Sequence, residues 1–269
     1  NDSAIKLIQE LKISGGCNVQ FALNPHTSEY YLIEVNPRVS RSSALASKAS
    51  GYPIARVTAK IAVGMTLEEI KIANTNAAFE PSLDYVIAKL PRFPFDKFAS
   101  ATNQLGTQMK ATGEIMGIGS TLEECLLKGI RSLETGVHHI HHAKFDNMAT
   151  DEILSYISQY RDDNIFAIAE LLSRGVSVEK LYDVTKITPY FLEAIQRIVA
   201  MEDTLKANVR DLETLKAAKK MGFGDKYIAR LWKCKELDVY NMRKEHNLFP
   251  VFKMVDTCHT GAYIPYFYS

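Results

Sequence analysis

The chain has 269 residues, a length that fits one large domain or two of ordinary size. Hydrophobic residues make up 46% of it and charged residues 23%, as in ordinary globular proteins. The net charge of +1 argues against nucleic acid or an acidic membrane surface as a partner, and no apolar run approaches the roughly 20 residues needed to cross a bilayer. The four cysteines form no C-x-x-C pair, so we expect reduced thiols in a cytoplasmic protein.

The first half of the chain predicts both strands and helices. A helix is in progress by Ser3 without an initiator Met, so we expect that the chain begins inside a domain. Apolar and more polar residues alternate over 18–24, and turn-forming residues separate this strand from a second one over 30–35, which predicts a hairpin. Thr121 followed by Glu124 predicts a capping box at the start of a helix. The other elements expected here are helices over 42–50, 54–63 and 121–133 and strands over 85–88 and 114–119.

Beyond Gly136 the pattern is almost entirely helical. Apolar residues recur at helical spacing in short segments, and Pro189 is predicted to occupy the first position of a longer helix. Short helices with short connections are typical of a compact helical bundle. We therefore predict a domain boundary between Thr135 and Thr150, and interpret the irregular, aromatic-rich tail over 251–269 as a linker.

Oxygen-bearing side chains gather on one face of the predicted hairpin. Glu34 and Asn36 are two residues apart on a strand and therefore share a face. Gln20 and Asn18 lie on the partner strand. A carboxylate and amide oxygens that converge on one sheet face suit a hard cation such as Mg²⁺, which takes its remaining ligands from phosphate and water.

Two arginines follow at the end of the second strand. The planar guanidinium groups of Arg38 and Arg41 suit phosphate or carboxylate oxygens. The segment is therefore interpreted as the metal- and phosphate-handling end of an ATP-dependent ligase site. The alternative is a solvated strand face, with Arg38 paired with Glu29 or Glu34, and residue chemistry alone leaves both interpretations open.

Several segments carry a resemblance to a known family. They are residues 14–25, 33–49, 79–86 and 108–114, and in the helical part 175–179, 215–224 and 250–258. These segments closely resemble the large subunit of carbamoyl phosphate synthetase, which contains two ATP-grasp halves. The run Ser40-Arg41-Ser42-Ser43-Ala44-Leu45-Ala46-Ser47-Lys48 is similar to the first, carboxyphosphate-forming half, whereas biotin-carboxylase-type enzymes share only the preceding E-x-N-P-R core.

This resemblance implies an α+β fold, with a partial ATP-grasp domain (an antiparallel-rich sheet with helices) followed by an all-α helical oligomerisation domain. The implied domains are residues 1–137 for the C-terminal portion of the carboxyphosphate synthetase domain, 138–250 for the oligomerisation domain and 251–269 for a linker toward a second synthetase half. The implied function is part of the ligase that makes carbamoyl phosphate from bicarbonate, glutamine-derived ammonia and two ATP. The resemblance leaves open whether that enzyme serves arginine synthesis, pyrimidine synthesis or both.

The resemblance also implies roles for the polar residues of the hairpin. Gln20, Glu34 and Asn36 are implied ligands of Mg²⁺ or Mn²⁺, with ATP as the substrate and K⁺ as a further ion. Gln20 and Glu34 are also expected near the nucleotide, with Asn18 supporting the site from the neighbouring strand position.

Arg38 and Arg41 are implied contacts of bicarbonate, carboxyphosphate or the transferred phosphoryl group. The implied partners are a small glutaminase subunit, a second copy through the helical domain, ATP and bicarbonate, with neither nucleic acid nor membrane.

The chain also departs from the family pattern. It has no counterpart of the Gly-rich lid over the phosphates, the upstream arginines, the adenine-binding segment, the second synthetase half or the allosteric domain. We therefore expect that the chain by itself does not turn over ATP. The alternative function is a helical assembly module with a vestigial nucleotide site. The His138–His142 run suits a transition metal, but its position at the predicted boundary favours a solvated linker.

Overall fold

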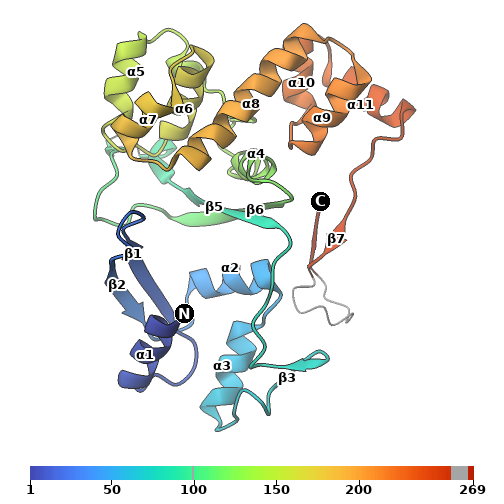
Figure 1. Cartoon of the computed structure of the whole chain (residues 1–269). Coiled ribbons are helices and arrows are strands. Elements are labelled where there is room, and N and C mark those ends of the chain that lie inside the picture. The colour runs from blue at the N-terminus through green and yellow to red at the C-terminus, as the bar shows by residue number, and fades with distance from the viewer. Residues whose placement is uncertain (99, 256–265) are drawn as a thin grey trace. The chain divides into compact units, whose positions relative to one another are not determined.

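The computed structural model describes residues 1–98, 100–255 and 266–269 (Figure 1). The described chain divides into two compact units. The first consists of residues 1–84 with the described part of 252–268, and the second of residues 85–251 with Ser269. The described strands form two-stranded antiparallel sheets, and helices dominate the later part of the chain. The predicted α+β fold class is therefore confirmed.

The first unit contains the predicted hairpin and both predicted helices that follow it. Its elements are α1 (Asp2–Glu10), β1 (Asn18–Leu23), β2 (Tyr30–Asn36), α2 (Arg41–Ser50), α3 (Ile54–Ala62), β3 (Lys71–Ile72), β4 (Thr75–Asn76), β7 (Lys253–Met254) and β8 (Phe267–Tyr268). The pairs β3–β4 and β7–β8 were not predicted, because two-residue strands are too short to show an alternating pattern.

The core of this unit is small. Val57, Ile70, Ile72 and Ala77 are buried together, and the hydroxyl of Tyr52 donates to the carbonyl oxygen of Ala77 at 2.6 Å. The hairpin contributes no buried side chain, and both Phe21 and Leu23 are exposed. Within the described residues the alternation of β1 is therefore not accompanied by burial, because β1 and β2 form a sheet of only two strands.

The second unit joins a hairpin to a helical bundle. Its elements are β5 (Val86–Arg92), a 3₁₀ turn at Pro94–Asp96, β6 (Gly113–Gly119), α4 (Leu122–Ser132), a 3₁₀ turn at Ala143–Phe145, α5 (Thr150–Ile157), α6 (Asn164–Ser173), α7 (Val178–Thr185), α8 (Pro189–Ala207), α9 (Leu212–Lys220), α10 (Asp225–Trp232) and α11 (Glu236–Glu245). The prediction of Pro189 at the first position of its helix is confirmed.

The start of α4 differs slightly from its prediction. The Thr121 hydroxyl accepts from the backbone N–H of Glu124, as a capping box requires. The Glu124 carboxylate, however, accepts from the N–H of Ser120 at 2.7 Å and not from that of Thr121. The acidic side chain therefore stabilises the turn that precedes the helix.

Helix α4 packs on the β5–β6 hairpin and belongs to the same core as the bundle (Figure 1). Leu127 and Ile130 of α4 are buried with residues of α5 to α11 in one continuous cluster. Gly117 of β6 permits the close approach, because a Cβ there would lie 2.2 Å from the carbonyl oxygen of Cys125.

Residues 256–265, which include Cys258 and most of the predicted linker, lie outside the described residues. The predicted domain limits after residues 137 and 250 stay predictions, since contacts within one chain do not tell where a module begins. In the part of the chain that is described, every helix is too short or too polar to cross a membrane.

Candidate functional site

The polar residues predicted to form a site lie opposite one another in the β1–β2 hairpin. Asn18 pairs with Asn36 and Gln20 pairs with Glu34 across the two antiparallel strands. Directly opposed residues, and residues two apart on one strand, project from the same face of a sheet. The four side chains are therefore brought together on one face, and the bulge follows only after Gln20.

Hydrogen bonds within this face fix the direction of its oxygens. The Asn36 Nδ2 donates to Glu34 Oε1 at 2.9 Å, and the Gln20 Nε2 donates to Asn18 Oδ1 at 3.2 Å. Because a carboxylate only accepts, Asn36 must present its nitrogen to Glu34 and keep its own oxygen available. Gln20 Oε1, Asn36 Oδ1 and the second oxygen of Glu34 are thus left to accept from or coordinate another group.

This donor set fits a hard divalent cation that also binds phosphate. It consists of one carboxylate and amide oxygens, and Mg²⁺ uses few protein oxygens beside those of water and phosphate. Gln20 and Glu34 are exposed, whereas Asn18 and Asn36 are half-buried. Among the described residues no group of three or more histidine, cysteine, aspartate or glutamate side chains is placed to hold a metal. The carboxylate and amide oxygens of the hairpin face suit a metal that is bound jointly with a ligand.

Arg38 and Arg41 follow the end of strand β2 in the chain. Arg38 is exposed and forms no ion pair with Glu29, Glu34 or any other described carboxylate, so the alternative that it merely neutralises a neighbouring acid is wrong. Arg41 is the first residue of α2, whose N-cap Ser40 exchanges hydrogen bonds with Ser43. A guanidinium beside a helix N-terminus provides positive potential for an anion.

The histidine run forms a second polar centre that the sequence did not indicate. The expectation of a solvated linker is wrong, because His139 and Ile140 are each only 1% exposed. His139 Nε2 lies 3.0 Å from Glu202 Oε1, and the Tyr227 hydroxyl donates to Glu202 Oε2 at 3.0 Å. The imidazole stacks on the Tyr227 ring with centroids 3.7 Å apart.

Burial controls the ionisation of this centre. It lowers the pKa of His139 and raises the pKa of Tyr227, and the Glu202 carboxylate adds to the second effect. His139 is therefore neutral at pH 7 and donates from Nε2 to Glu202, while its buried Nδ1 has no hydrogen-bond partner among the described residues. The sequence offered no signal for this, since Glu202 and Tyr227 are more than sixty residues from His139.

Cys125 is buried and takes part in packing. Cys17, Cys125 and Cys234 are free thiols, and burial raises the pKa of Cys125 to about 11. The Cys125 thiol instead donates to the carbonyl oxygen of Val86 at 2.9 Å. Cys125 is thus a structural residue of the contact between α4 and β5.

Two family models match the chain. The model described as the oligomerisation domain of the carbamoyl-phosphate synthetase large chain matches residues 114–247, which include the histidine run and helices α4 to α11. The model described as the ATP binding domain of the carbamoyl-phosphate synthase L chain matches residues 1–70, which include the hairpin face, Arg38 and Arg41. Together the two matches cover about three quarters of the chain.

Proposed function

The chain belongs to the carbamoyl-phosphate synthetase large-chain family, with an ATP-binding and an oligomerisation part, and we propose that its hairpin face contributes to phosphorylation of bicarbonate. The observation that carries this proposal is the register of β1 and β2, which sets Gln20 opposite Glu34 and Asn18 opposite Asn36. The face lies within the segment that matches the ATP-binding domain.

The proposed overall reaction makes carbamoyl phosphate from bicarbonate, glutamine-derived ammonia and two ATP. In the proposed step, a bicarbonate oxygen attacks the γ-phosphorus of ATP, the bond to the bridging oxygen breaks, and ADP leaves. The run from Ser40 to Lys48 supports the assignment to the first, carboxyphosphate-forming half, because it is similar to that half in sequence.

Gln20, Glu34 and Asn36 are proposed to hold Mg²⁺ or Mn²⁺. When bound, such an ion neutralises charge on the β- and γ-phosphates. The hydrogen bond from Asn36 to Glu34 leaves one oxygen of each side chain to coordinate the ion, and the bond from Gln20 to Asn18 orients the Gln20 amide. Asn18 therefore acts as a positioning residue in this proposal.

Arg38 and Arg41 are proposed to bind bicarbonate and the phosphoryl group during transfer. Arg38 has no counter-ion among the described residues, so its charge is available to an anionic ligand. Arg41 stands at the start of α2, where the helix dipole also favours negative charge. Both groups would stabilise charge on the equatorial oxygens of the transferred group.

We propose that the 269-residue chain by itself does not turn over ATP. Gln20 and Glu34 are exposed, whereas phosphoryl transfer to bicarbonate requires a site that excludes competing water. Activity is proposed to depend on further parts of the ligase, including a glutaminase subunit in the cytoplasm. Bicarbonate-dependent release of ADP by the purified chain, above a buffer blank, would overturn this proposal.

Metal binding on the hairpin face is tested by electron paramagnetic resonance of Mn²⁺ in the presence of ATP. Wild-type protein should bind Mn²⁺–ATP, and Glu34→Gln should weaken binding at least about ten-fold because it removes the only carboxylate of the face. Glu29→Gln is the matched control, since Glu29 is an exposed acid of the same hairpin that bonds to Thr27. Equal affinities in Glu34→Gln and Glu29→Gln would contradict the assignment.

A second function, assembly, is favoured by the match of residues 114–247 to an oligomerisation domain. We propose that a second copy of the chain binds through this part. Light scattering over a range of protein concentrations should show a mass that rises with concentration. A monomer throughout that range would contradict self-association of the chain.

A further inference from the structure

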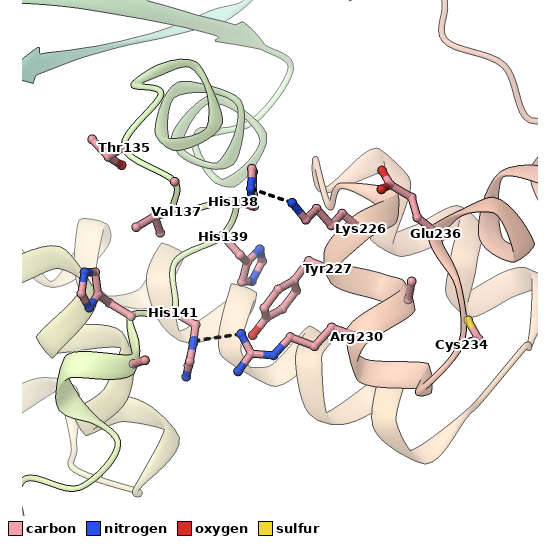
Figure 2. A pocket seen from close by; sticks show the side chains of 14 residues that line it. Thr135, Val137, His138, His139, His141, Lys226, Tyr227, Arg230, Cys234 and Glu236 are labelled. Atoms are coloured by element: carbon pink, nitrogen blue, oxygen red, sulfur yellow. Dashed lines mark hydrogen bonds between the residues drawn. The ribbon is translucent and has the colours of Figure 1, made fainter.

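A cavity of about 670 Å³ lies in the second unit between the histidine run and α10 (Figure 2). Its volume falls within the range of small-molecule sites, about 300–1,000 Å³. Residues 135–139 and 141–143 line one side, and Lys226, Tyr227 and Arg230 line the other, with Cys234 and Glu236 near the start of α11. The proposed ligase function uses none of these residues.

The cavity carries two positive charges that no described carboxylate neutralises. Lys226 and Arg230 are one helical turn apart on α10, and each reaches an imidazole. Lys226 Nζ lies 2.9 Å from His138 Nε2, and Arg230 Nη1 lies 3.4 Å from His141 Nδ1 (Figure 2). Neither cation forms an ion pair within the described ranges, in contrast to Lys219, whose Nζ lies 2.8 Å from Asp225 Oδ1.

These contacts determine which imidazole nitrogens carry protons. An ammonium or guanidinium group only donates, so His138 Nε2 and His141 Nδ1 must accept. The proton of each ring that donates a hydrogen bond is then on its other nitrogen. His141 Nε2 donates to Asp146 at 2.9 Å, which leaves the Nδ1–H of His138 as a donor. Most polar groups that line the cavity are therefore donors, and Glu236 is its single lining carboxylate among the described residues.

The buried part of the histidine run holds this wall in position. His139 is fixed by its bond to Glu202 of α8 and by stacking on Tyr227 of α10. Ile140 is buried in the core of the bundle. Because residues 139 and 140 are anchored, His138 and His141 on either side of them are held next to α10, and the cationic groups are arranged before a ligand arrives.

We propose that this cavity binds a small anionic molecule through a phosphate or carboxylate group held by Lys226, Arg230 and His138. The ligand would replace the imidazole contacts of the two cations with charge-assisted hydrogen bonds, which are stronger than bonds to a neutral acceptor. This gives the oligomerisation part a ligand site of its own, separate from the hairpin face in sequence and in chemistry.

Calorimetric titration of the whole chain with inorganic phosphate, and separately with citrate, tests the proposal. Wild-type protein should bind at least one of the two, and the stronger of them identifies the preferred oxygen group. The double variant Lys226→Gln/Arg230→Gln should bind at least about ten-fold more weakly. The charge-matched control is Lys220→Gln/Lys244→Gln, which removes two exposed lysines outside the cavity lining and should bind as wild type does.

A second measurement does not depend on the folding of any variant. In wild-type protein, phosphate or citrate should shift the imidazole NMR signals of His138 and His141 and leave those of His26 and His246 unchanged, because the latter two lie outside the cavity. Absence of binding by wild type, equal binding by the two double variants, or equal shifts at all four histidines would each overturn the proposal.

Discussion

Replacing Gly117 by alanine is expected to force β6 and α4 apart. A Cβ at this buried position would lie 2.2 Å from the carbonyl oxygen of Cys125 and 3.2 Å from the backbone nitrogen of Gly129. Ordinary van der Waals contact begins at 3.4 Å, so the strand and the helix must separate by about 1.2 Å. Both neighbouring atoms belong to the helix backbone, which cannot rotate away as a side chain would.

The cost follows from the packing around the contact. Overpacking a well-packed core costs about 1–3 kcal/mol. A gap of about 1 Å also removes a quarter to a half of the dispersion attraction of the atoms beside it, here those of α4 around Leu127. We therefore expect a loss of about 3 kcal/mol, near the upper end of that range. For a unit of this size each kcal/mol lowers the melting temperature by about 2–4 °C, which predicts a decrease of about 6–12 °C.

Gly106→Ala provides the matched control. A Cβ at Gly106 meets no atom within 4 Å, and the residue belongs to the same compact unit. Both substitutions reduce the freedom of the unfolded chain equally, so their difference isolates the contact between β6 and α4. Urea unfolding followed by far-ultraviolet circular dichroism gives the two free energies of unfolding. A difference below about 0.5 kcal/mol, within the error of additivity, would refute this account of the packing.

Three further outcomes are expected. Burial lowers the pKa of His139 below its ordinary value of 6.5, so on acidification His139 is protonated in the unfolded chain before it is protonated in the folded chain. The contribution of neutral His139 to the free energy of unfolding is therefore fully present above about pH 6.5 and is lost as pH falls toward the pKa of the folded state. Melting temperatures between about pH 7.5 and 5.5 should thus fall more steeply in wild type than in His139→Phe, and equal slopes would contradict this. Tyr227→Phe removes the hydroxyl that donates to Glu202 and should lower the free energy of urea unfolding by about 1–2 kcal/mol, whereas an unchanged value would mean that Glu202 finds another donor. Cys125→Ala should leave the number of thiols that react rapidly with DTNB in native protein unchanged and lower it by one after unfolding, because burial raises the pKa of Cys125 to about 11; a lower native number would show that this thiol is accessible.

The grouping of Asn18, Gln20, Glu34 and Asn36 was predictable because it depends on local rules. A strand alternates its faces every second residue, and a short turn returns the chain antiparallel, so the shared face followed from two strands and a turn. The bulge after Gln20 was not predictable, because it depends on which backbone groups pair across the strands.

The exposure of the hairpin was not predictable either. Val19, Phe21 and Leu23 alternate with more polar residues and so indicated one apolar face, yet Leu23 is 64% exposed within the described residues. Alternation reports which side chains share a face, while burial depends on what another part of a protein places over that face.

The sequence by itself determined that the polar residues of the hairpin share one face, that the second half is helical, and which family the chain resembles, because strand and helix periods and motif residues are local properties of the chain. Only the tertiary structure decided the role of the histidine run. His139 is buried because α8 supplies Glu202 and α10 supplies Tyr227 to the same point, and contacts between residues so far apart in sequence leave no periodic signal. The same packing sets His138 and His141 beside Lys226 and Arg230 and so creates a charged cavity. In the sequence, each of these residues taken alone indicates only a solvent-exposed side chain.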